Sequence, residues 1–208
     1  MSMATALDPR HTALVIIDLQ DDFLAPEGAY ARGGAVSPAA QALPPRVAAV
    51  AKTLKAAGGM VVGSQFTLWP DAQGEPMISP HLKALRPFLR RGDFAPGSAG
   101  QAMVSDIAPW VDVAVCKVAY SAFFNTQLDW VLRRAGITTV AVCGIVTNGG
   151  VASTVRDAHM RDYRTLVLSD GCAAFKQEVH DTSLADMANV AQVLTCADFS
   201  AAVSASAA

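Results

Sequence analysis

Six short apolar runs, rich in Val and Ile, limit what this chain of 208 residues can fold into. None alternates cleanly between apolar and polar side chains, which predicts strands buried on both faces. Segments with helical patterns separate the runs, and this alternation predicts an α/β fold in which helices cover both faces of a parallel sheet. We expect residues 1–208 to form one domain. The six runs are residues 13–18, 60–66, 111–117, 138–144, 164–170 and 191–196.

Start and stop signals mark the expected helices. Pro44 and Pro45 precede a helical pattern over residues 46–59, which ends on two glycines. Asn125 is placed to cap a helix over residues 126–136. Two further helical patterns cover residues 151–161 and 182–190.

Two segments lack a clear pattern. Residues 67–112 form the longest irregular stretch, and such long loops often cover a functional site. The Ala- and Ser-rich residues 200–208 are expected to be frayed.

Composition excludes several classes of function. The chain is 52% hydrophobic and 16% charged, so it is expected to fold. Its net charge of −2 and the absence of basic runs indicate no nucleic-acid partner. No apolar stretch approaches the ~18 residues of a membrane helix, and the first residues do not resemble a secretory signal. We therefore expect a cytoplasmic protein with a small-molecule substrate and no membrane partner.

The cysteines and histidines show no metal-binding spacing, so no metal ion and no cofactor are expected. The absence of a G-x-S-x-G segment argues against a serine triad, and Ser64, Ser121 and Ser153 are interpreted as having no catalytic part. His159 and His180 lie on helical patterns and are not expected to act directly. The four cysteines are expected to be buried, reduced thiols: Cys116, Cys143, Cys172 and Cys196.

Polar groups follow the apolar runs where a ligand of a parallel sheet would bind, beyond the carboxyl ends of the strands. Asp18 ends the first run, Gln65 lies near the end of the second, and Lys117 ends the third. A carboxylate and an ammonium that meet at buried strand ends can form an acid–base pair with a tuned pKa. A purely structural ion pair explains Asp18 and Lys117 equally well.

The fourth run ends in a glycine-rich turn over residues 144–150 that leads into an expected helix. Free backbone N–H groups at such a turn can hold a carboxylate or an oxyanion, and Gly149 and Gly150 would let a ligand approach closely. A tight strand-to-helix connection with no ligand is the alternative. The turn is not a phosphate-binding loop, because no Gly-Lys-Ser/Thr follows.

Four segments in this order resemble the isochorismatase-like hydrolases, also called the cysteine hydrolase superfamily. They are ALVIIDLQDDF with Asp18, KVAYSAF with Lys117, GIVTNGGVASTVRDA and VLSDGCAAF. The resemblance implies a three-layer α/β/α, Rossmann-like fold with a six-stranded parallel sheet. It also implies a homo-oligomer, a dimer or tetramer, and a cis peptide between Ile145 and Val146 that aims a backbone N–H into the site.

The chain differs from the amidase members of this superfamily at the position of the nucleophile. Those enzymes have a T-N-x-C-V pattern whose Cys attacks the amide, aided by an Asp and a Lys. Here Thr147, Asn148 and Val151 match, but Gly150 stands at the Cys position. The Asp-x-His motif that binds zinc in nicotinamidases is also missing, since the corresponding stretch is SQFTLWPD.

Isochorismatases proper resemble this chain in lacking that Cys, and they cleave a vinyl ether by proton transfer from the Asp. We therefore expect a hydrolase of a small carboxylated molecule, with a vinyl ether or amide bond, that uses Asp18, Lys117 and water. The alternatives are a non-catalytic ligand-binding relative and an amidase whose Cys at position 150 was replaced. The expected substrate-binding residues are Phe23, Gln65, Trp69, Tyr120, Val146, Thr147, Asn148 and Gly149, with Arg90 or Arg91 as candidates for a substrate carboxylate and Phe124 for the pocket or a subunit interface.

Overall fold

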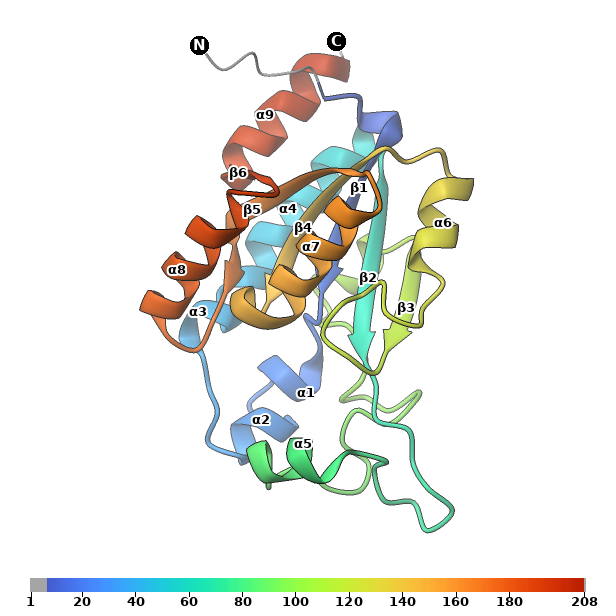
Figure 1. The fold of residues 1–208 in the computed structure, drawn as a ribbon, viewed down its shortest axis with the longest axis vertical. Helices are drawn as coiled ribbons and strands as arrows, with labels where there is room; N and C mark the ends of the chain where they lie inside the picture. Colours follow the sequence, from blue (N-terminus) through green and yellow to red (C-terminus); the bar gives the residue numbers. More distant parts are fainter. Residues whose placement is uncertain (1–6, 208) are drawn as a thin grey trace.

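The computed structural model describes residues 7–207 and shows a six-stranded parallel sheet (Figure 1). The spatial order of the strands is β3-β2-β1-β4-β5-β6. The predicted α/β class and parallel sheet are therefore confirmed. The strands are β1 (Thr12–Ile17), β2 (Met60–Phe66), β3 (Val113–Lys117), β4 (Thr139–Ile145), β5 (Arg164–Ala173) and β6 (Gln192–Leu194).

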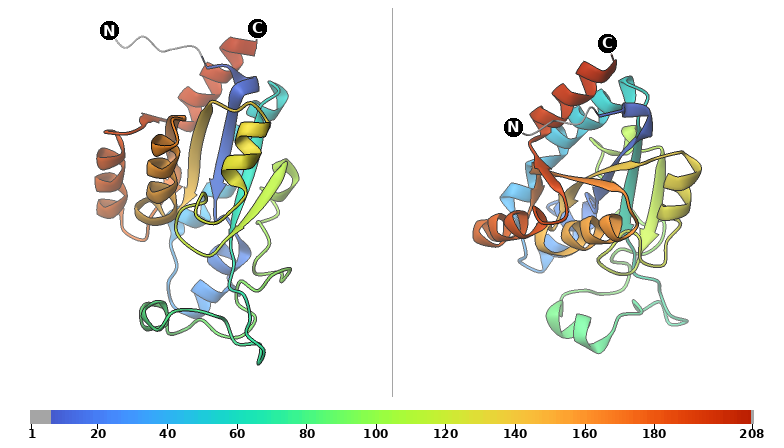
Figure 2. Two further views of the ribbon diagram at one scale, coloured as in Figure 1. Left: turned by 45° about the vertical axis from the view of Figure 1, so that its right-hand side comes forward. Right: turned by 45° about the horizontal axis from the view of Figure 1, so that its top comes forward.

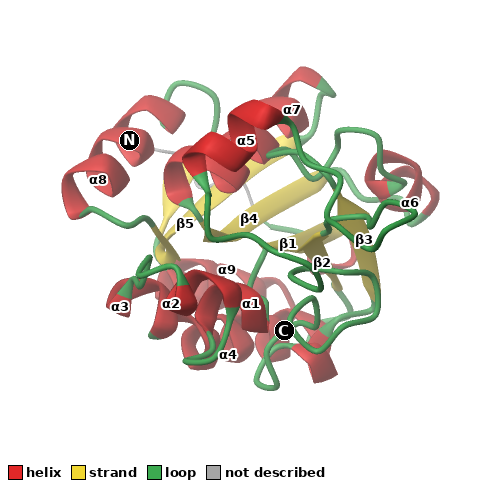
Figure 3. Cartoon of the chain, turned by 90° about the horizontal axis from the view of Figure 1, so that it is seen from below, coloured by secondary structure: helices red, strands yellow, loops and turns green. Residues whose placement is uncertain are grey.

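Helices form a layer on each face of the sheet, as Figure 3 shows, with α7 and α8 on one side and α4 and α9 on the other. Over the described residues, no helix is both long and apolar enough to cross a membrane. The α-helices are α1 (Asp21–Leu24), α2 (Ala29–Arg32), α3 (Pro38–Gln41), α4 (Leu43–Ala56), α5 (Pro80–Leu85), α6 (Leu128–Arg134), α7 (Ala152–Met160), α8 (Gln177–Met187) and α9 (Cys196–Ala207). Shorter helical turns are η1 (Pro9–His11), η2 (Ala108–Trp110) and η3 (Thr147–Val151).

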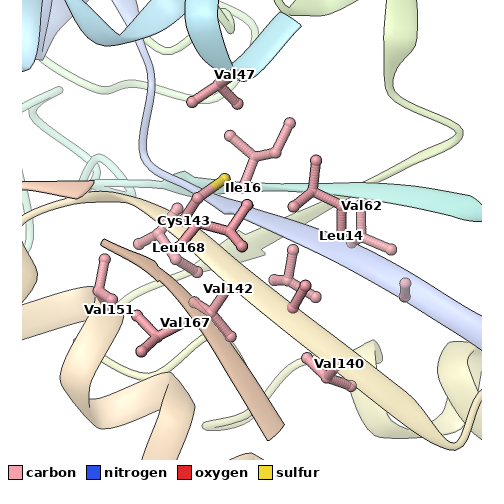
Figure 4. Packing of buried hydrophobic residues seen from close by; sticks show 14 of the residues in the cluster. Leu14, Ile16, Val47, Val62, Val140, Val142, Cys143, Val151, Val167 and Leu168 are labelled. Carbon is pink, nitrogen blue, oxygen red and sulfur yellow. The ribbon is translucent and has the colours of Figure 1, made fainter. Parts of the chain in front are cut away.

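The central strands β1 and β4 carry the core, because every residue of both is buried. Figure 4 shows Val47 of α4 on one side of these strands and Val151 on the other, with Ile16 and Val142 between them. Burying one such side chain contributes about 1.5–3 kcal/mol. Because both faces of these strands are packed against helices, their sequences do not alternate between apolar and polar residues.

The edge strands correct the prediction that every strand is buried on both faces. In β3 the side chains of Ala114 and Cys116 are exposed, and in β6 so are those of Gln192 and Val193. Among residues 7–207, neither edge strand has a neighbouring strand on its outer side, and each leaves part of its surface exposed. Cys116 is thus an exposed thiol, contrary to expectation, while the other three cysteines are buried and all four are free.

Helix boundaries also differ from the predictions. Helix α4 covers Leu43–Ala56 and not residues 46–59, so Pro44 and Pro45 lie in its first turn and not before it. Asn125 does not cap α6, because it has a left-handed backbone (φ 53°) and the helix begins only at Leu128. The Thr126 hydroxyl accepts the Leu128 N–H at 3.1 Å instead. Helix α8 covers Gln177–Met187, so the predicted span of 182–190 began too late and ended too late. Residues 177–181 are polar except for Val179, so they gave no apolar pattern to detect.

The C-terminal segment is a helix, so the prediction of a frayed tail was wrong. Phe199 and Val203 lie four residues apart on one face of α9 and are fully buried in the core. Figure 2 shows α9 running alongside α4. Ala201 and Ala202 between these two anchors are good helix formers, although the composition of the segment resembles that of a linker.

The long segment over residues 67–112 lies beyond the carboxyl ends of the strands. In Figure 1 the arrows of β2 and β3 point toward α5, which belongs to this segment, and toward α1 and α2. The Gln20 side chain ties the segment to the sheet, since its Nε2 donates to the Phe66 and Gln101 carbonyl oxygens at 3.0 and 2.8 Å. We call residues 67–112 the lid segment.

Phe199→Ala is expected to lower the free energy of unfolding by about 3–5 kcal/mol, because it removes a fully buried ring from the contact of α9 with the core. Urea unfolding followed by circular dichroism measures this loss. Ser204→Ala is the control, since Ser204 is exposed on the same helix and should change stability by less than about 0.5 kcal/mol. Equal, small effects of both substitutions would show that α9 does not anchor the fold.

Candidate active site

A pocket of about 410 Å³ opens at the carboxyl ends of the central strands. It lies where β1 has β2 on one side and β4 on the other, so that the chain connections diverge in opposite directions. Open parallel sheets bind ligands at such a switch point. The volume is within the range of small-molecule sites, and much of the wall is apolar. Its apolar lining includes Phe23, Phe66, Leu89, Ile145, Val146 and Phe175.

A buried ion pair forms the polar part of the pocket wall. Lys117 Nζ lies 2.6 Å from Asp18 Oδ2, and the two side chains are 2% and 7% exposed. Lys117 Nζ also donates to the Ala119 carbonyl oxygen at 3.0 Å and lies 5.7 Å from the centre of the Phe66 ring. The structure therefore brings together the acid and base that the sequence predicted.

Ser64 completes the surroundings of the carboxylate, and the sequence interpretation missed it. Its hydroxyl donates to Asp18 Oδ1 at 2.9 Å from inside β2. Burial raises the pKa of Asp18 above its ordinary value, although the charge of Lys117 and the hydrogen bonds from Lys117 and Ser64 partly offset this. A raised pKa makes a carboxyl a stronger base, which suits a group that has to take up a proton.

The glycine-rich turn borders the same pocket. The peptide between Ile145 and Val146 is cis, as the resemblance implied. The Gly149 and Val151 N–H groups both donate to the Val146 carbonyl oxygen, at 2.9 and 3.3 Å. Gly150 lies between these two donors and lines the pocket, so its N–H is a candidate donor to a substrate oxygen.

Two buried threonines hold this turn. The Thr154 hydroxyl donates to the Gly150 carbonyl oxygen at 2.7 Å and accepts the Ala122 N–H at 3.0 Å. The Thr147 hydroxyl forms a 2.8 Å hydrogen bond with His180 Nδ1 of α8. Thr147 thus supports the turn from behind and does not line the pocket.

Packing around Gly150 leaves little room for a side chain. A Cβ at this position would lie 2.8 Å from Ile17 Cγ2 and 3.1 Å from the Ile145 carbonyl oxygen. Because real Cβ contacts are not this short, any larger residue requires Ile17, the neighbour of Asp18, to move.

The other predicted binding residues divide into two groups. Phe23, Tyr120, Val146, Asn148 and Gly149 line the pocket. Gln65 does not, because its side chain donates to the Gln101 carbonyl oxygen at 2.9 Å and so holds the lid segment. Trp69 and Phe124 are half exposed outside the pocket lining, Arg91 pairs with Glu75, and exposed Arg90 is not part of the lining.

Three polar pocket residues were missed by the sequence analysis: Tyr30, His81 and Arg86. Tyr30 comes from α2, His81 from α5, and Arg86 directly follows α5. Both helices are short and carry no apolar period, so the sequence offered no signal that would place these residues at the ends of the strands.

Cys143 and Cys172 do not supply a thiol nucleophile to the pocket, since neither is among its lining residues. Burial raises the pKa of both thiols above their ordinary value, which disfavours the reactive thiolate.

The donor set of the nicotinamidase zinc site does not fit this chain. Asp71 accepts the Gln73 and Glu75 N–H groups in an exposed turn, each at 2.9 Å. No group of three or more His, Cys, Asp or Glu side chains suited to a metal ion occurs among residues 7–207.

Fold and pocket together define an α/β domain with a pocket at a sheet switch point. The chain belongs to the isochorismatase family, because the Isochorismatase domain family matches residues 12–198. It is a hydrolase of that family.

Named relatives and solved structures agree with this assignment. The chain is 33% identical to the ureidoacrylate amidohydrolase RutB of Methylobacterium radiotolerans over 193 residues, covering 88% of this chain and 75% of that protein. A cysteine hydrolase from Pseudomonas syringae pv. phaseolicola superposes with a TM-score of 0.83 at 27% identity, over 99% and 100% of the two chains. An N-carbamoylsarcosine amidase from Thermoplasma acidophilum superposes with a TM-score of 0.70 at 26% identity, over 89% of this chain and 96% of that one.

Lys117→Met is expected to lower the free energy of unfolding by about 3–5 kcal/mol at about pH 8, because it leaves the Asp18 carboxylate buried and unpaired. The loss should shrink toward about pH 5. Without Lys117 the already raised pKa of folded Asp18 rises further above its ordinary value. The folded variant then binds a proton that the unfolded chain lacks, which restores stability as the pH falls.

Urea unfolding at both pH values measures this dependence, with Lys55→Met as the matched control. Lys55 pairs with Asp112 at the surface, so its loss should cost only about 0–1 kcal/mol and vary little with pH. A cost for Lys117→Met that is the same at both pH values would contradict the raised pKa of Asp18.

Proposed function

We propose that this chain hydrolyses a small carboxylated molecule with Asp18 and Lys117 as its acid–base pair and water as the nucleophile. A C–N bond of the amide type is the favoured target. The relatives named ureidoacrylate amidohydrolase support this choice, because a ureidoacrylate carries both a carboxylate and such a bond. A homo-oligomer, a dimer or tetramer, is part of the proposal and rests on the family resemblance alone. A cytoplasmic location is also part of the proposal and rests on the sequence features described above.

The buried pair of Asp18 and Lys117 in the pocket wall is the observation that carries the proposal. A buried ion pair costs desolvation energy, and an apolar pair of similar volume is often at least as stable. Its position in a pocket, where it can reach a ligand, supports a chemical role.

Amide hydrolysis would proceed without a covalent enzyme intermediate. Asp18 takes a proton from water while the water oxygen attacks the carbonyl carbon. The N–H groups of Val146 and Gly150 would hold the developing oxyanion. When the C–N bond breaks, Asp18 returns the proton to the leaving nitrogen, and Lys117 stabilises the carboxylate throughout.

Vinyl ether hydrolysis is the second candidate, and the observation that favours it is that the pocket lining contains no cysteine from the described part of the chain. Asp18 would protonate the enol ether carbon and water would capture the resulting cation, so this reaction needs no sulfur nucleophile. The two candidates differ in their products, since a primary amide or ureido substrate releases ammonia and an isochorismate-type vinyl ether releases pyruvate.

Asp18→Asn is expected to reduce kcat about 10²- to 10⁴-fold on any substrate that the parent turns over, because the amide cannot transfer the proton. Ammonia and pyruvate release from a panel of carboxylated amides and vinyl ethers measure the activity. Asp181→Asn, an exposed change on α8, should retain full activity.

Retained activity in Asp18→Asn would refute the mechanism. Tight binding of small acids by the parent without turnover on the whole panel would instead identify a ligand-binding relative.

Gly150→Cys and Gly150→Ala are both expected to reduce turnover and to destabilise the protein by about 1–3 kcal/mol, because either Cβ displaces Ile17 beside Asp18. Both variants add a Cβ but only Gly150→Cys adds a thiol, so a comparison of the two separates the effect of side-chain volume from that of the sulfur. Steady-state kinetics measures turnover, and thermal unfolding measures stability. Amide hydrolysis that appears in Gly150→Cys, exceeds the parent's and is absent from Gly150→Ala would show an amidase whose nucleophile was replaced.

A further inference from the structure

Arg86 gives the pocket an unbalanced positive charge. Two cationic side chains line the pocket, Lys117 and Arg86, and the first is neutralised by Asp18. Arg86 has no carboxylate within 4.0 Å among the residues that the structure describes. Within this chain the charge therefore has no counterpart, and the pocket complements an anion.

The guanidinium of Arg86 is held in place by neutral partners. Nη1 donates to the Leu85 carbonyl oxygen at 2.9 Å, and Nε donates to the Tyr30 hydroxyl at 3.2 Å. The guanidinium carbon also lies 6.0 Å from the centre of the Tyr30 ring. These contacts use two of the five N–H donors of the group and leave others for a carboxylate.

Tyr30 supplies a second donor at the same place. Burial raises the pKa of its hydroxyl, partly offset by the hydrogen bond from Arg86, so the group keeps its proton at neutral pH. Since its oxygen already accepts from Arg86, its own hydrogen is free to donate toward the pocket.

We propose that Arg86 and Tyr30 bind the carboxylate of the substrate and that the bond to be cleaved lies at the opposite, Asp18 end. This inference rests on the proposed function for the position of the bond, but not for the binding of the carboxylate. Arg86 comes from the lid segment and Asp18 from the sheet, so a bound substrate bridges the two.

The walls between these ends restrict the middle of the substrate. The Phe23 ring lies 4.6 Å from Tyr30 and 6.2 Å from Phe66, and all three rings line the pocket. Aromatic rings match a planar or unsaturated carbon chain, whereas a polyhydroxylated one would leave its hydroxyl groups without partners. The substrate class is thus a monocarboxylate with a short apolar or unsaturated spacer.

A purely structural role for Arg86, as a latch that ties α5 to Tyr30, is the competing explanation. It predicts that substitution affects charged and neutral ligands alike. Ligand charge is therefore the variable that separates the two roles.

The test measures ligand binding by calorimetry in the full parent chain, because Asp18→Asn would leave Lys117 as a second cation without a counter-charge. The probes are cinnamate and benzoate, which carry no amide or vinyl ether bond, each paired with its methyl ester. We expect at least one acid to bind more tightly than its ester. Arg86→Gln should weaken that acid about 10- to 100-fold, the size of a charge-assisted contact, and leave the ester unchanged.

Three further variants test whether the geometry of Arg86 and the hydroxyl of Tyr30 contribute to binding of the acid. Arg86→Lys keeps the charge but loses the planar fork, so it should recover only part of the affinity. Tyr30→Phe should weaken the acid several-fold and spare the ester. Arg91→Gln is the control, because Arg91 lies in the same segment, is exposed and pairs with Glu75.

No preference for an acid over its ester in any pair would overturn the proposal, and so would equal weakening of both by Arg86→Gln. The outcome is independent of turnover. A carboxylate preference that depends on Arg86 in a protein that hydrolyses nothing would refute the proposed function while supporting this site.

Discussion

The buried ion pair of Asp18 and Lys117 is the constraint on which the arrangement of the site depends. The two residues follow or end β1 and β3, which are not neighbours, since β2 lies between them. The pair therefore forms across a whole strand, and β2 must supply suitable residues beneath it. Ser64 donates to the carboxylate and Phe66 lies under the ammonium. Without such partners, desolvation of the two charges would exceed their attraction.

The close approach of β1 and β4 serves the same site from the other side. Gly144 has a positive φ of 110°, and a Cβ there would lie 2.1 Å from the Ile17 carbonyl oxygen. Only glycine fits this contact, which sets the path of the chain into the cis peptide and the turn around Gly150. Thr154 then fixes the Gly150 carbonyl from within α7. The turn residue Gly150 and the acid Asp18, which follows β1, thus border the same pocket.

The features that could be predicted from sequence are those with local signals. Continuous apolar runs marked the six strands, and polar residues at their ends marked Asp18 and Lys117. Ser64 gave no such signal, because a serine within an apolar strand has the same sequence context whether or not it reaches a carboxylate. Arg86 and Tyr30 meet only through tertiary packing of two short helices. The edge strands were misjudged because neighbours in space, not in sequence, decide their exposure.

The chemistry of the pocket follows from how its charges are divided between sheet and lid. At the sheet, Asp18 and Lys117 cancel each other, so that end can hold a neutral group such as an amide or an enol ether. At the lid, Arg86 is uncancelled, so that end favours an anion. A ligand with the opposite order would place its carboxylate where the charges of Asp18 and Lys117 already cancel, and it would leave Arg86 without a counter-charge. In the proposed site this polarity would orient a substrate before any catalytic step, and it would require nothing at position 150 beyond a backbone N–H and the space that glycine leaves.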